Sequence, residues 1–431
     1  MNELVVLLDG EEVGIVRQRA GRLSFTYHEA WQSSPGGYPL SLSLPLAAAE
    51  HPHAAVNTYL WGLLPDNERV LERWARQFQV SARSAFGLLA AVGEDCAGAV
   101  QLVPRARVAR ITRGRAREVD WLSTRDVARR LRALVEDAAA WRASADEGQF
   151  SLAGAQPKTA LYFERGRWGV PRGRTPTTHI LKPTLPTLDG HAENEHLCLE
   201  LARELGLPTA TSKVQRFEDL TAVVVERYDR VPLDGVVRRV HQEDLCQALG
   251  RLPNKKYENE GGPSAADVVG LLRAAVVGDA EPSEASPVAE TDVRTFIDAL
   301  VFNWLIGGTD GHAKNYSLLL GPGRVRLAPL YDLGSIYAYP DIQPKKAKLA
   351  MKIAGKYRIE EIHPPQWKAF ARTLRVSSDE LVERLWTLAA TLKEALPAQV
   401  SRLREAGLTH PILPRIEAAV TERAKRLVRQ A

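Results

Sequence analysis

The residues best suited to chemistry are gathered in two short stretches, NWLIGGTDGHAKNYSLLL (303–320) and LAPLYDLGS (327–335). Asp310 and Asn315 stand five positions apart, and Asp332 follows an apolar, strand-like run. Phosphoryl transfer needs one carboxylate that orients and deprotonates the acceptor hydroxyl. It also needs an amide and a second carboxylate that hold Mg²⁺ against the phosphates. An isolated Asp-Gly most often marks a turn, but the joint spacing predicts a phosphotransferase with Asp310 as base and Asn315 and Asp332 as metal ligands.

Two other residues of the first stretch have an ambiguous role. His312 and Lys314 lie between Asp310 and Asn315, and either could contact phosphate oxygens. His312 could equally be a packed loop residue, so the sequence leaves both interpretations open.

A lysine on a predicted strand supplies the second element of such a site. HILKP places Lys182 at a strand end, as in the V-A-I-K strand of protein kinases, where the lysine reaches the α- and β-phosphates. A carboxylate on the following helix normally holds that lysine in place. Glu195, in the amphipathic stretch AENEHLCLELA, is the predicted partner, and Glu193 and Glu200 compete for the role.

Two further segments are weaker candidates for nucleotide contact. In FSLAGAQPKTA (150–160), Gly and Ala let the backbone approach a phosphate and consecutive N–H groups can cradle its oxygens, although a simple hairpin turn is the alternative. In VVVERYDR (223–230), an apolar strand runs into Glu226, Arg227 and Tyr228. This suits a hinge whose backbone meets an adenine edge, and an edge strand with a solvated end fits equally well.

The elements that must position these residues fall into three predicted regions. Residues 1–104 predict a small α+β domain, residues 105–240 a nucleotide-binding lobe, and residues 241–431 a mainly helical lobe. The first region combines strands with helices. Its predicted elements are a hairpin with Asp9-Gly10 at its tip, strands LSFTY (23–27) and SLSL (41–44), two helices punctuated by Pro65 and Asp66-Asn67, and a closing strand GAVQLVP.

The second region begins with a basic, weakly patterned connector over 105–122 and a helix from Thr124 to about Ala140. A Gly-rich turn flanked by strands, a helix and a further hairpin then follow in the order expected of a nucleotide-binding lobe. In the third region, GDAEPSEASPVAE (278–290) has the composition of a mobile surface loop. The elements along the whole chain therefore predict a mixed α+β fold.

Bulk properties exclude several other classes of protein. The 431 residues carry a net charge of +5, too mild an excess to indicate a nucleic-acid reader by itself, and the arginine-dense stretch 105–117 reads as solvated surface. Cys96, Cys198 and Cys246 form no metal-ligand spacing and are predicted to be buried thiols in a reducing compartment. The N-terminus reads as a strand, and no run approaches a membrane span. We expect a cytoplasmic protein with no membrane partner.

The motifs taken together resemble the HipA family, the kinase toxins of type II toxin–antitoxin modules that pair with a helix-turn-helix antitoxin, HipB. LSLSLPL (40–46) and LLPDNERV (63–70) match the small N-terminal domain of that family. The remaining matching motifs, in family order, are FSLAGAQPKTAL, TPTTHILKP, VVVERYDR, HQEDLCQALG, NKKYENEGGP, NWLIGGTDGHAKNYS and LYDLGS.

The resemblance implies a two-lobed kinase that uses ATP and Mg²⁺ to phosphorylate protein serine or threonine. It implies an aminoacyl-tRNA synthetase as substrate, with the glutamate enzyme the best-known case, followed by growth arrest and antibiotic tolerance. It also implies co-repression of the operon with a HipB-like dimer on operator DNA, and self-inactivation by phosphorylation of Ser151. The implied nucleotide contacts are Ala153, Gly154, Ala155, Gln156, Pro157 and Lys158 of the phosphate loop, Lys182 with Glu195, Glu226, Arg227 and Tyr228 of the hinge, His312, Ala313, Lys314 and Asn315 of the catalytic loop, and Tyr331, Asp332, Leu333 and Gly334.

Two departures and two alternatives accompany this interpretation. Pro157 replaces the acidic residue usual before Lys158, and the loop 278–290 is longer and more acidic than the family leads us to expect. A small-molecule kinase of the aminoglycoside-phosphotransferase type would normally show H-x-D, whereas here His312 follows Asp310. A pseudoenzyme that only assists DNA binding by an antitoxin would not need the intact set of kinase residues.

Overall fold

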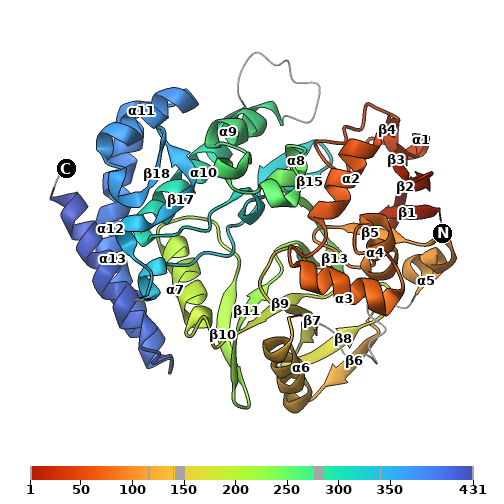
Figure 1. Cartoon of the computed structure of the whole chain (residues 1–431), viewed down its shortest axis with the longest axis horizontal. Helices are drawn as coiled ribbons and strands as arrows, with labels where there is room; N and C mark the ends of the chain where they lie inside the picture. The colour runs from red at the N-terminus through yellow and green to blue at the C-terminus, as the bar shows by residue number, and fades with distance from the viewer. Residues whose placement is uncertain are drawn as a thin grey trace.

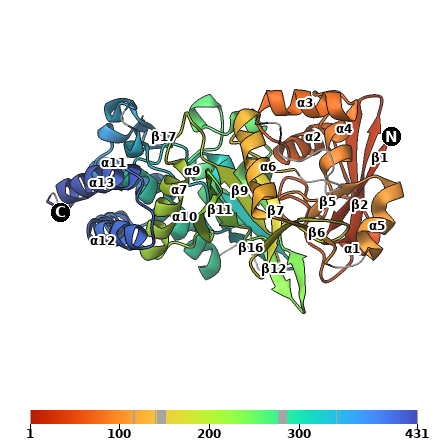
Figure 2. The same ribbon diagram turned by 90° about the horizontal axis from the view of Figure 1, so that it is seen from below.

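The computed structural model describes residues 2–114, 117–138, 140, 151–275, 286–339 and 341–429. The part of the predicted mobile loop that spans 278–285 lies outside these ranges, as does Phe150. Across the described chain, helices and strands form the predicted two-lobed α+β fold, with an N-terminal unit at one end and the last helices at the other (Figures 1 and 2). None of the helices that the structure describes is both long and apolar enough to cross a membrane.

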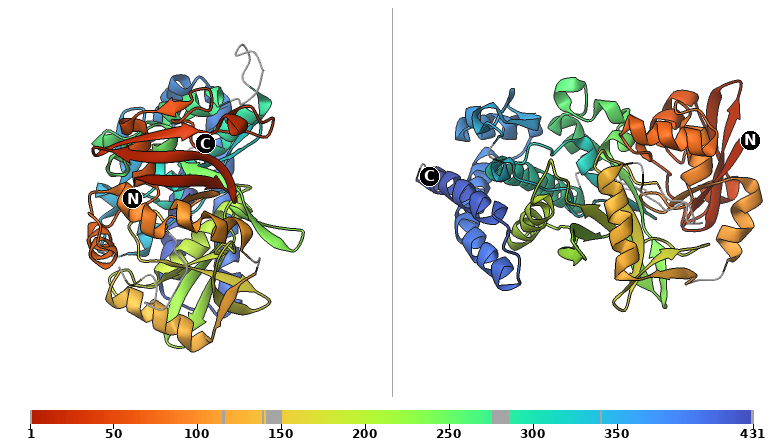
Figure 3. Two further views of the ribbon diagram at one scale, coloured as in Figure 1. Left: turned by 90° about the vertical axis from the view of Figure 1, so that its right-hand side faces the viewer. Right: turned by 60° about the horizontal axis from the view of Figure 1, so that its bottom comes forward.

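The N-terminal unit is an antiparallel sheet with most of its helices packed on one face and the helix Val108–Arg113 on the other, where Ile111 packs against Val5, Leu7 and Val103. The left view of Figure 3 shows this sheet from its outer side. The predicted hairpin is present: Asp9 and Gly10 both adopt positive φ, at 49° and 86°, as a two-residue hairpin turn requires. The predicted strand 23–27 and the two helices around Pro65 are also confirmed. The elements are β1 (Glu3–Leu8), β2 (Glu11–Arg19), β3 (Arg22–Tyr27), α1 (Glu29–Gln32), β4 (Glu50–His51), α2 (His53–Gly62), α3 (Glu68–Phe78), α4 (Ala85–Val92) and β5 (Val100–Val103), with strand order β4-β3-β2-β1-β5.

The predicted strand SLSL (41–44) is wrong, because these residues form a tight turn closed by a bridge between Ser41 and Leu44. The alternating serines do not face solvent from a sheet. The Ser41 hydroxyl and the Leu42 N–H, the latter at 2.8 Å, both donate to the buried carboxylate of Glu243 in the C-terminal lobe. The turn therefore joins the N-terminal unit to the rest of the chain.

The nucleotide-binding lobe is built on a second antiparallel sheet of order β10-β11-β9-β7-β8-β6. Part of the predicted connector 105–122 is regular structure, since β6 pairs with β8 and extends this sheet. Ser123 caps the helix predicted from Thr124 through a capping box with Asp126, and that helix ends at Glu136. Helix α5 (Val108–Arg113) precedes this lobe and packs on the N-terminal sheet. The elements of the lobe are β6 (Val119–Leu122), α6 (Thr124–Glu136), β7 (Thr159–Glu164), β8 (Arg167–Pro171), β9 (His179–Pro183), α7 (His191–Glu204), β10 (Ser212–Phe217) and β11 (Leu220–Glu226), followed by the hairpin β12 (Arg230–Leu233) and β13 (Val236–Arg239).

The C-terminal lobe is mainly helical, as predicted, but also contains a three-stranded sheet of order β14-β15-β16 that carries the catalytic loop. Residues 287–290, predicted as loop, form the first turn of α10. The elements are β14 (His241–Asp244), α8 (Leu245–Ala248), α9 (Ala265–Ala274), α10 (Pro287–Ile306), β15 (Ser317–Gly321), β16 (Arg324–Leu327), β17 (Lys348–Ile353), β18 (Lys356–Arg358), α11 (Pro364–Leu374), α12 (Ser378–Glu405) and α13 (Ile412–Val428).

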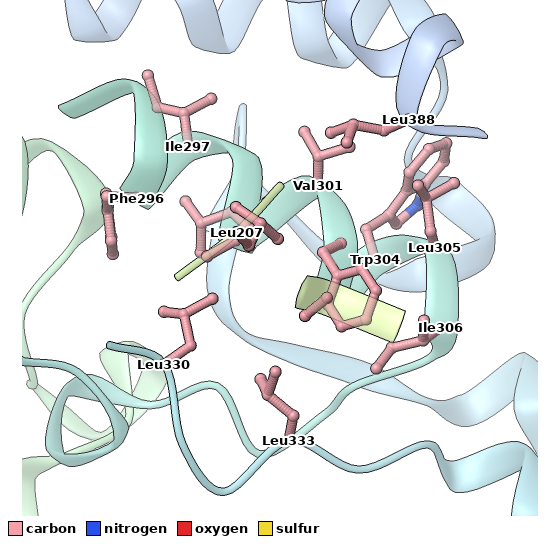
Figure 4. Packing of buried hydrophobic residues seen from close by; sticks show 14 of the residues in the cluster. Leu207, Phe296, Ile297, Val301, Trp304, Leu305, Ile306, Leu330, Leu333 and Leu388 are labelled. Atoms are coloured by element: carbon pink, nitrogen blue, oxygen red, sulfur yellow. The ribbon is translucent and has the colours of Figure 1, made fainter. Parts of the chain in front are cut away.

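Helix α10 is the central support of the C-terminal lobe. Its apolar side chains are buried against neighbouring helices and against the segment that carries Leu330 and Leu333 (Figure 4). The helix ends at Gly307, which has a φ of 72°, and a Cβ there would lie 2.7 Å from the Tyr337 ring. The predicted catalytic loop begins directly after this cap, so the loop is anchored on a largely buried helix. The three predicted buried thiols are all free and buried.

Candidate active site

Lys182 stands at the centre of the site. It lies on β9 with its side chain only 7% exposed, and its Nζ is 2.7 Å from both Glu195 Oε1 and Asp332 Oδ1. Glu195 projects from α7, which lies beside β11 of the same sheet. Of the competing carboxylates, Glu193 is buried away from this lysine and Glu200 pairs with Arg203.

The electrostatics of this cluster keep all three groups ionised. Burial by itself would raise the pKa of Asp332, but the ammonium groups of Lys182 and Lys158 outweigh it and hold the pKa well below its usual range. Burial likewise opposes ionisation of Glu195, and Lys182 again outweighs it and lowers the pKa. Burial would lower the pKa of Lys182, but the two carboxylates raise it above its ordinary value. Asp332 also adopts a positive φ of 58°, an uncommon backbone state for a non-glycine residue.

The catalytic loop brings Asp310, Asn315 and His312 together. The Asn315 Nδ2 donates to the Asp310 carbonyl at 2.7 Å, which fixes the loop and leaves the amide oxygen for another partner. The Asp310 carboxylate is 64% exposed and accepts a hydrogen bond from the Tyr257 hydroxyl. Sequence reasoning missed Tyr257, although it lies in the NKKYENEGGP motif.

His312 is a packed residue of this loop. Its side chain is 5% exposed, its ring meets the Tyr257 ring edge-on at 4.9 Å, and its Nε2 is 3.7 Å from Asp310 Oδ1. Burial lowers its pKa, so the imidazole is neutral at pH 7. Its Nδ1 is buried and has no partner among the described residues, so one polar atom remains for a ligand.

The phosphate loop folds over Lys158. The Lys158 Nζ donates to the Ala153 carbonyl at 2.7 Å, and a Cβ on Gly154, whose φ is 103°, would lie 2.6 Å from that Nζ. The positive φ therefore favours glycine at this point of the loop, whereas the flexible tip of Lys158 could move aside. Burial, followed by the nearby Lys182 charge, lowers the pKa of Lys158 to about 8. The Gln156 Nε2 is buried and has no hydrogen-bond partner in the described part of the chain.

Ser151 is fully buried at the start of this loop. Its hydroxyl donates to the Leu63 carbonyl at 2.7 Å, and its N–H donates to the Asp95 carbonyl at 3.1 Å. Both acceptors belong to the N-terminal unit. The hydroxyl becomes accessible only if the loop leaves this position.

Lys314 is engaged in a buried ion pair beside the phosphate loop. Its side chain is 3% exposed and its ammonium pairs with the carboxylate of Asp66, which also accepts from Lys256 Nζ at 3.0 Å. The sequence marked Asp66 only as a turn residue. No local signal assigns it to the site, because its partners lie 248 and 190 positions away along the chain.

The predicted hinge uses two of its backbone N–H groups and the Arg227 side chain inside the fold. Strand β11 ends at Glu226, and the N–H groups of Glu226 and Arg227 donate to the Thr211 and Thr178 carbonyls. The Arg227 side chain is buried and points elsewhere, into a cluster of ion pairs with Asp229 and Asp95. Its guanidinium is therefore structural.

The residues around Asp332 are mostly structural. Tyr331 donates to the Lys314 carbonyl at 2.8 Å, and its ring lies 5.9 Å from the Tyr228 ring. The side chain of Leu333, a predicted nucleotide contact, is buried in the hydrophobic core beside α10 (Figure 4). Ala313 is fully buried and its N–H donates to the Lys256 carbonyl.

The donor set fits a nucleoside triphosphate with a divalent cation. The carboxylate of Asp332 and the free amide oxygen of Asn315 are hard oxygen ligands, and Mg²⁺ is commonly held by one or two such groups together with substrate phosphates. Lys158 and Lys182 are the neighbouring ammonium groups that would pair with phosphate oxygens. The orphaned Gln156 Nε2 and His312 Nδ1 add unused polar atoms in the two loops.

Family models match both parts of the chain. The HipA N-terminal domain matches residues 4–103, and the HipA-like C-terminal domain matches residues 150–396. The chain is 36% identical over 409 residues to the putative kinase Y4mE of Sinorhizobium fredii, covering 91% of this chain and 90% of that protein. It is 30% identical over 377 residues to the serine/threonine-protein kinase toxin HipA of Shewanella oneidensis, covering 86% and 82%.

A solved structure shares the complete fold. The S. oneidensis toxin–antitoxin complex of HipA, HipB and its operator DNA contains a chain that superposes with a TM-score of 0.80, at 26% identity and 99% coverage of each chain. The fold and the arrangement of Lys182, Glu195, Asp310, Asn315 and Asp332 define a protein kinase. The chain belongs to the HipA family, as the sequence motifs indicated.

Proposed function

We propose that this chain is a Mg-ATP-dependent serine/threonine kinase and the toxin of a toxin–antitoxin module. The observation that carries the proposal is the buried Lys182, held at 2.7 Å from both Glu195 and Asp332 next to the loop of Asp310 and Asn315. Kinases use this arrangement to fix the triphosphate and to orient the acceptor hydroxyl. The S. oneidensis relative named a kinase toxin supports it.

Each group suits its proposed task. The Asp310 carboxylate is exposed enough to meet a serine or threonine hydroxyl and take its proton during transfer. Asn315 and Asp332 would hold Mg²⁺, which neutralises charge on the phosphates when bound. Lys182, and Lys158 after leaving the Ala153 carbonyl, would bind phosphate oxygens, while Glu226 and Tyr228 would present backbone to the adenine.

The biological setting is inferred from the family. We propose an aminoacyl-tRNA synthetase as substrate, most readily the glutamate enzyme, so that phosphorylation halts translation and causes growth arrest and persistence. A HipB-like dimer would supply the helices that read operator DNA, because a net charge of +5 supports only weak, non-specific DNA binding by this chain. ATP and an operator are both cytoplasmic, which supports that location.

Ser151 would be the site of self-inactivation. A phosphate there adds close to two negative charges beside the phosphates of bound nucleotide. It also cannot keep the buried hydrogen bond of the hydroxyl to Leu63. Both effects favour a displaced loop and weak nucleotide binding.

The function is tested by Asp310→Asn, with Asp379→Asn as the matched control on an exposed aspartate at the start of α12. Asp310→Asn should keep Mg-ATP binding in calorimetry but lower transfer of labelled phosphate to a synthetase panel or to its own chain by at least about 10²-fold. The control should transfer phosphate normally. Undiminished transfer by Asp310→Asn would remove Asp310 from the role of base.

A further inference from the structure

A short segment of the N-terminal unit, residues 63–66, reaches into the active site between α2 and α3; we call it the clamp segment. It touches the phosphate loop at both of its ends. The Ser151 hydroxyl donates to the Leu63 carbonyl at 2.7 Å, and the Asp66 N–H donates to the Gly154 carbonyl at 3.2 Å. Pro65 and Gly154 also form a parallel bridge. The phosphate loop is therefore fastened in its closed position by backbone from outside the two kinase lobes.

The carboxylate of the clamp segment contacts the catalytic loop. Asp66 is 12% exposed and accepts from both Lys314 and Lys256. Lys314 immediately precedes Asn315, and Lys256 immediately precedes Tyr257, whose hydroxyl donates to the Asp310 carboxylate. Burial opposes ionisation of Asp66, but the two lysines outweigh it and lower the pKa, so the group is anionic at pH 7.

These contacts are not needed to attach the N-terminal unit. A separate buried network joins it to the nucleotide-binding lobe, in which Asp95 Oδ1 is 2.8 Å from Arg230 and 3.2 Å from Arg239. The Ser41–Leu42 turn adds hydrogen bonds to Glu243 in the C-terminal lobe. Loss of the Asp66 charge should therefore loosen the site without releasing the unit.

We propose that Asp66 is a positioning residue for the kinase reaction: it holds Lys314 and the Lys256–Tyr257 pair in place and, with Leu63, keeps the phosphate loop closed over the nucleotide and over Ser151. The proposal rests on the proposed function and extends it by assigning part of the active site to the N-terminal unit. Because a closed loop is already ordered, nucleotide binds without the entropy cost of ordering it.

The test uses Asp66→Asn in the full chain, which keeps the side-chain shape and the backbone N–H but removes the charge. Asp298→Asn is the matched control, since Asp298 is a similarly buried aspartate whose Arg384 partner lies 2.8 Å away on α12. Hydrogen–deuterium exchange without nucleotide should become about five-fold faster or more in both 151–158 and 310–316 of Asp66→Asn. The control should match the wild type there.

The exchange measurement requires no kinase activity, so it separates this proposal from the proposed function. In calorimetry, Asp66→Asn should also raise the Kd for Mg-ATP by about ten-fold. Exchange at the control rate in either segment overturns the positioning role, whereas a wild-type chain that binds no Mg-ATP overturns the proposed function. If Asp66→Asn does not fold, Lys256→Met tests the same link, and unchanged exchange at 310–316 in that variant also overturns it.

Discussion

Replacing Lys182 with methionine should reverse the pH dependence of the central cluster. In the wild type, one ammonium lies 2.7 Å from both Glu195 and Asp332. Lys182→Met keeps most of the aliphatic volume but removes the one ammonium that both carboxylates contact directly, which leaves only the weaker influence of Lys158 and His191. Glu195, with a 2% exposed side chain, can gain little from water, whereas Asp332 is 29% exposed and can be partly hydrated.

The size of the effect follows from this burial. Removing one partner of a buried ion pair typically costs about 3–5 kcal/mol, and we expect a loss of that order in the free energy of unfolding at pH 7.5. In the wild type the pKa values of Glu195 and Asp332 are both lowered. The stability that these two ionised groups contribute is therefore complete above the ordinary carboxyl pKa, and it is lost only as the pH falls through the lowered values. In the variant, burial and mutual repulsion raise both values, so stability is instead lost as the pH rises through them.

The measurement is urea unfolding of both proteins at pH 5.5 and pH 7.5. The difference in the free energy of unfolding between variant and wild type should be smaller at pH 5.5 than at pH 7.5, by at least about 1 kcal/mol. Lys356→Met is the control, because Lys356 is 49% exposed and pairs at 3.5 Å with Glu361, which is 41% exposed, so a loss of roughly 0–1 kcal/mol is expected. A Lys182→Met loss equal to the control, or one that does not change between the two pH values, would refute the electrostatic reasoning.

Three further predictions concern the ligand and the loop. Asn315→Ala and Asp332→Asn should weaken binding of Mg-ATP far more than binding of metal-free ATP, and equal weakening in calorimetry would exclude them as metal ligands. The pKa of Lys158 is lowered to about 8, so binding of a phosphate near that pH should add a proton to Lys158. In calorimetry, the heat of binding should then change with the ionisation enthalpy of the buffer. Because this folded-state value lies below that of an unfolded lysine, stability without nucleotide should rise as the pH increases from about 8 to about 10.5. Ser151→Ala should stay active and fail to silence itself on incubation with ATP, and a phosphate found elsewhere by mass spectrometry would contradict that role.

Local patterns in the sequence predicted most elements and the residues at the centre of the site. Asp310, Asn315 and Asp332 lie within one continuous stretch, so their spacing alone restricts how far apart the chain can place them. Lys182 and Glu195 lie on a strand and the helix that follows it, which is a similarly local relation. The hairpin at Asp9-Gly10 follows from turn chemistry that involves only neighbouring residues.

The tertiary structure decided which of several equivalent residues takes part. Glu193, Glu195 and Glu200 all lie on α7, and only the rotation of that helix against the sheet brings Glu195 to Lys182. The stretch SLSL has strand-like alternation, but hydrogen bonds to Glu243, 201 positions away from Leu42, stabilise a turn instead. Leu333 follows Asp332 directly, yet packing against α10 turns it into the core.

The residues that sequence reasoning missed are those whose partners are distant in the chain. Tyr257 meets Asp310 across 53 positions, and Asp66 meets Lys314 across 248. Hydrophobic periodicity and motif spacing report only on neighbours along the chain, whereas these pairs form because separate units pack together. The sequence by itself therefore determined most elements and the predicted central groups, and only tertiary packing determined that residues 63–66 of the N-terminal unit contact both the phosphate loop and Lys314.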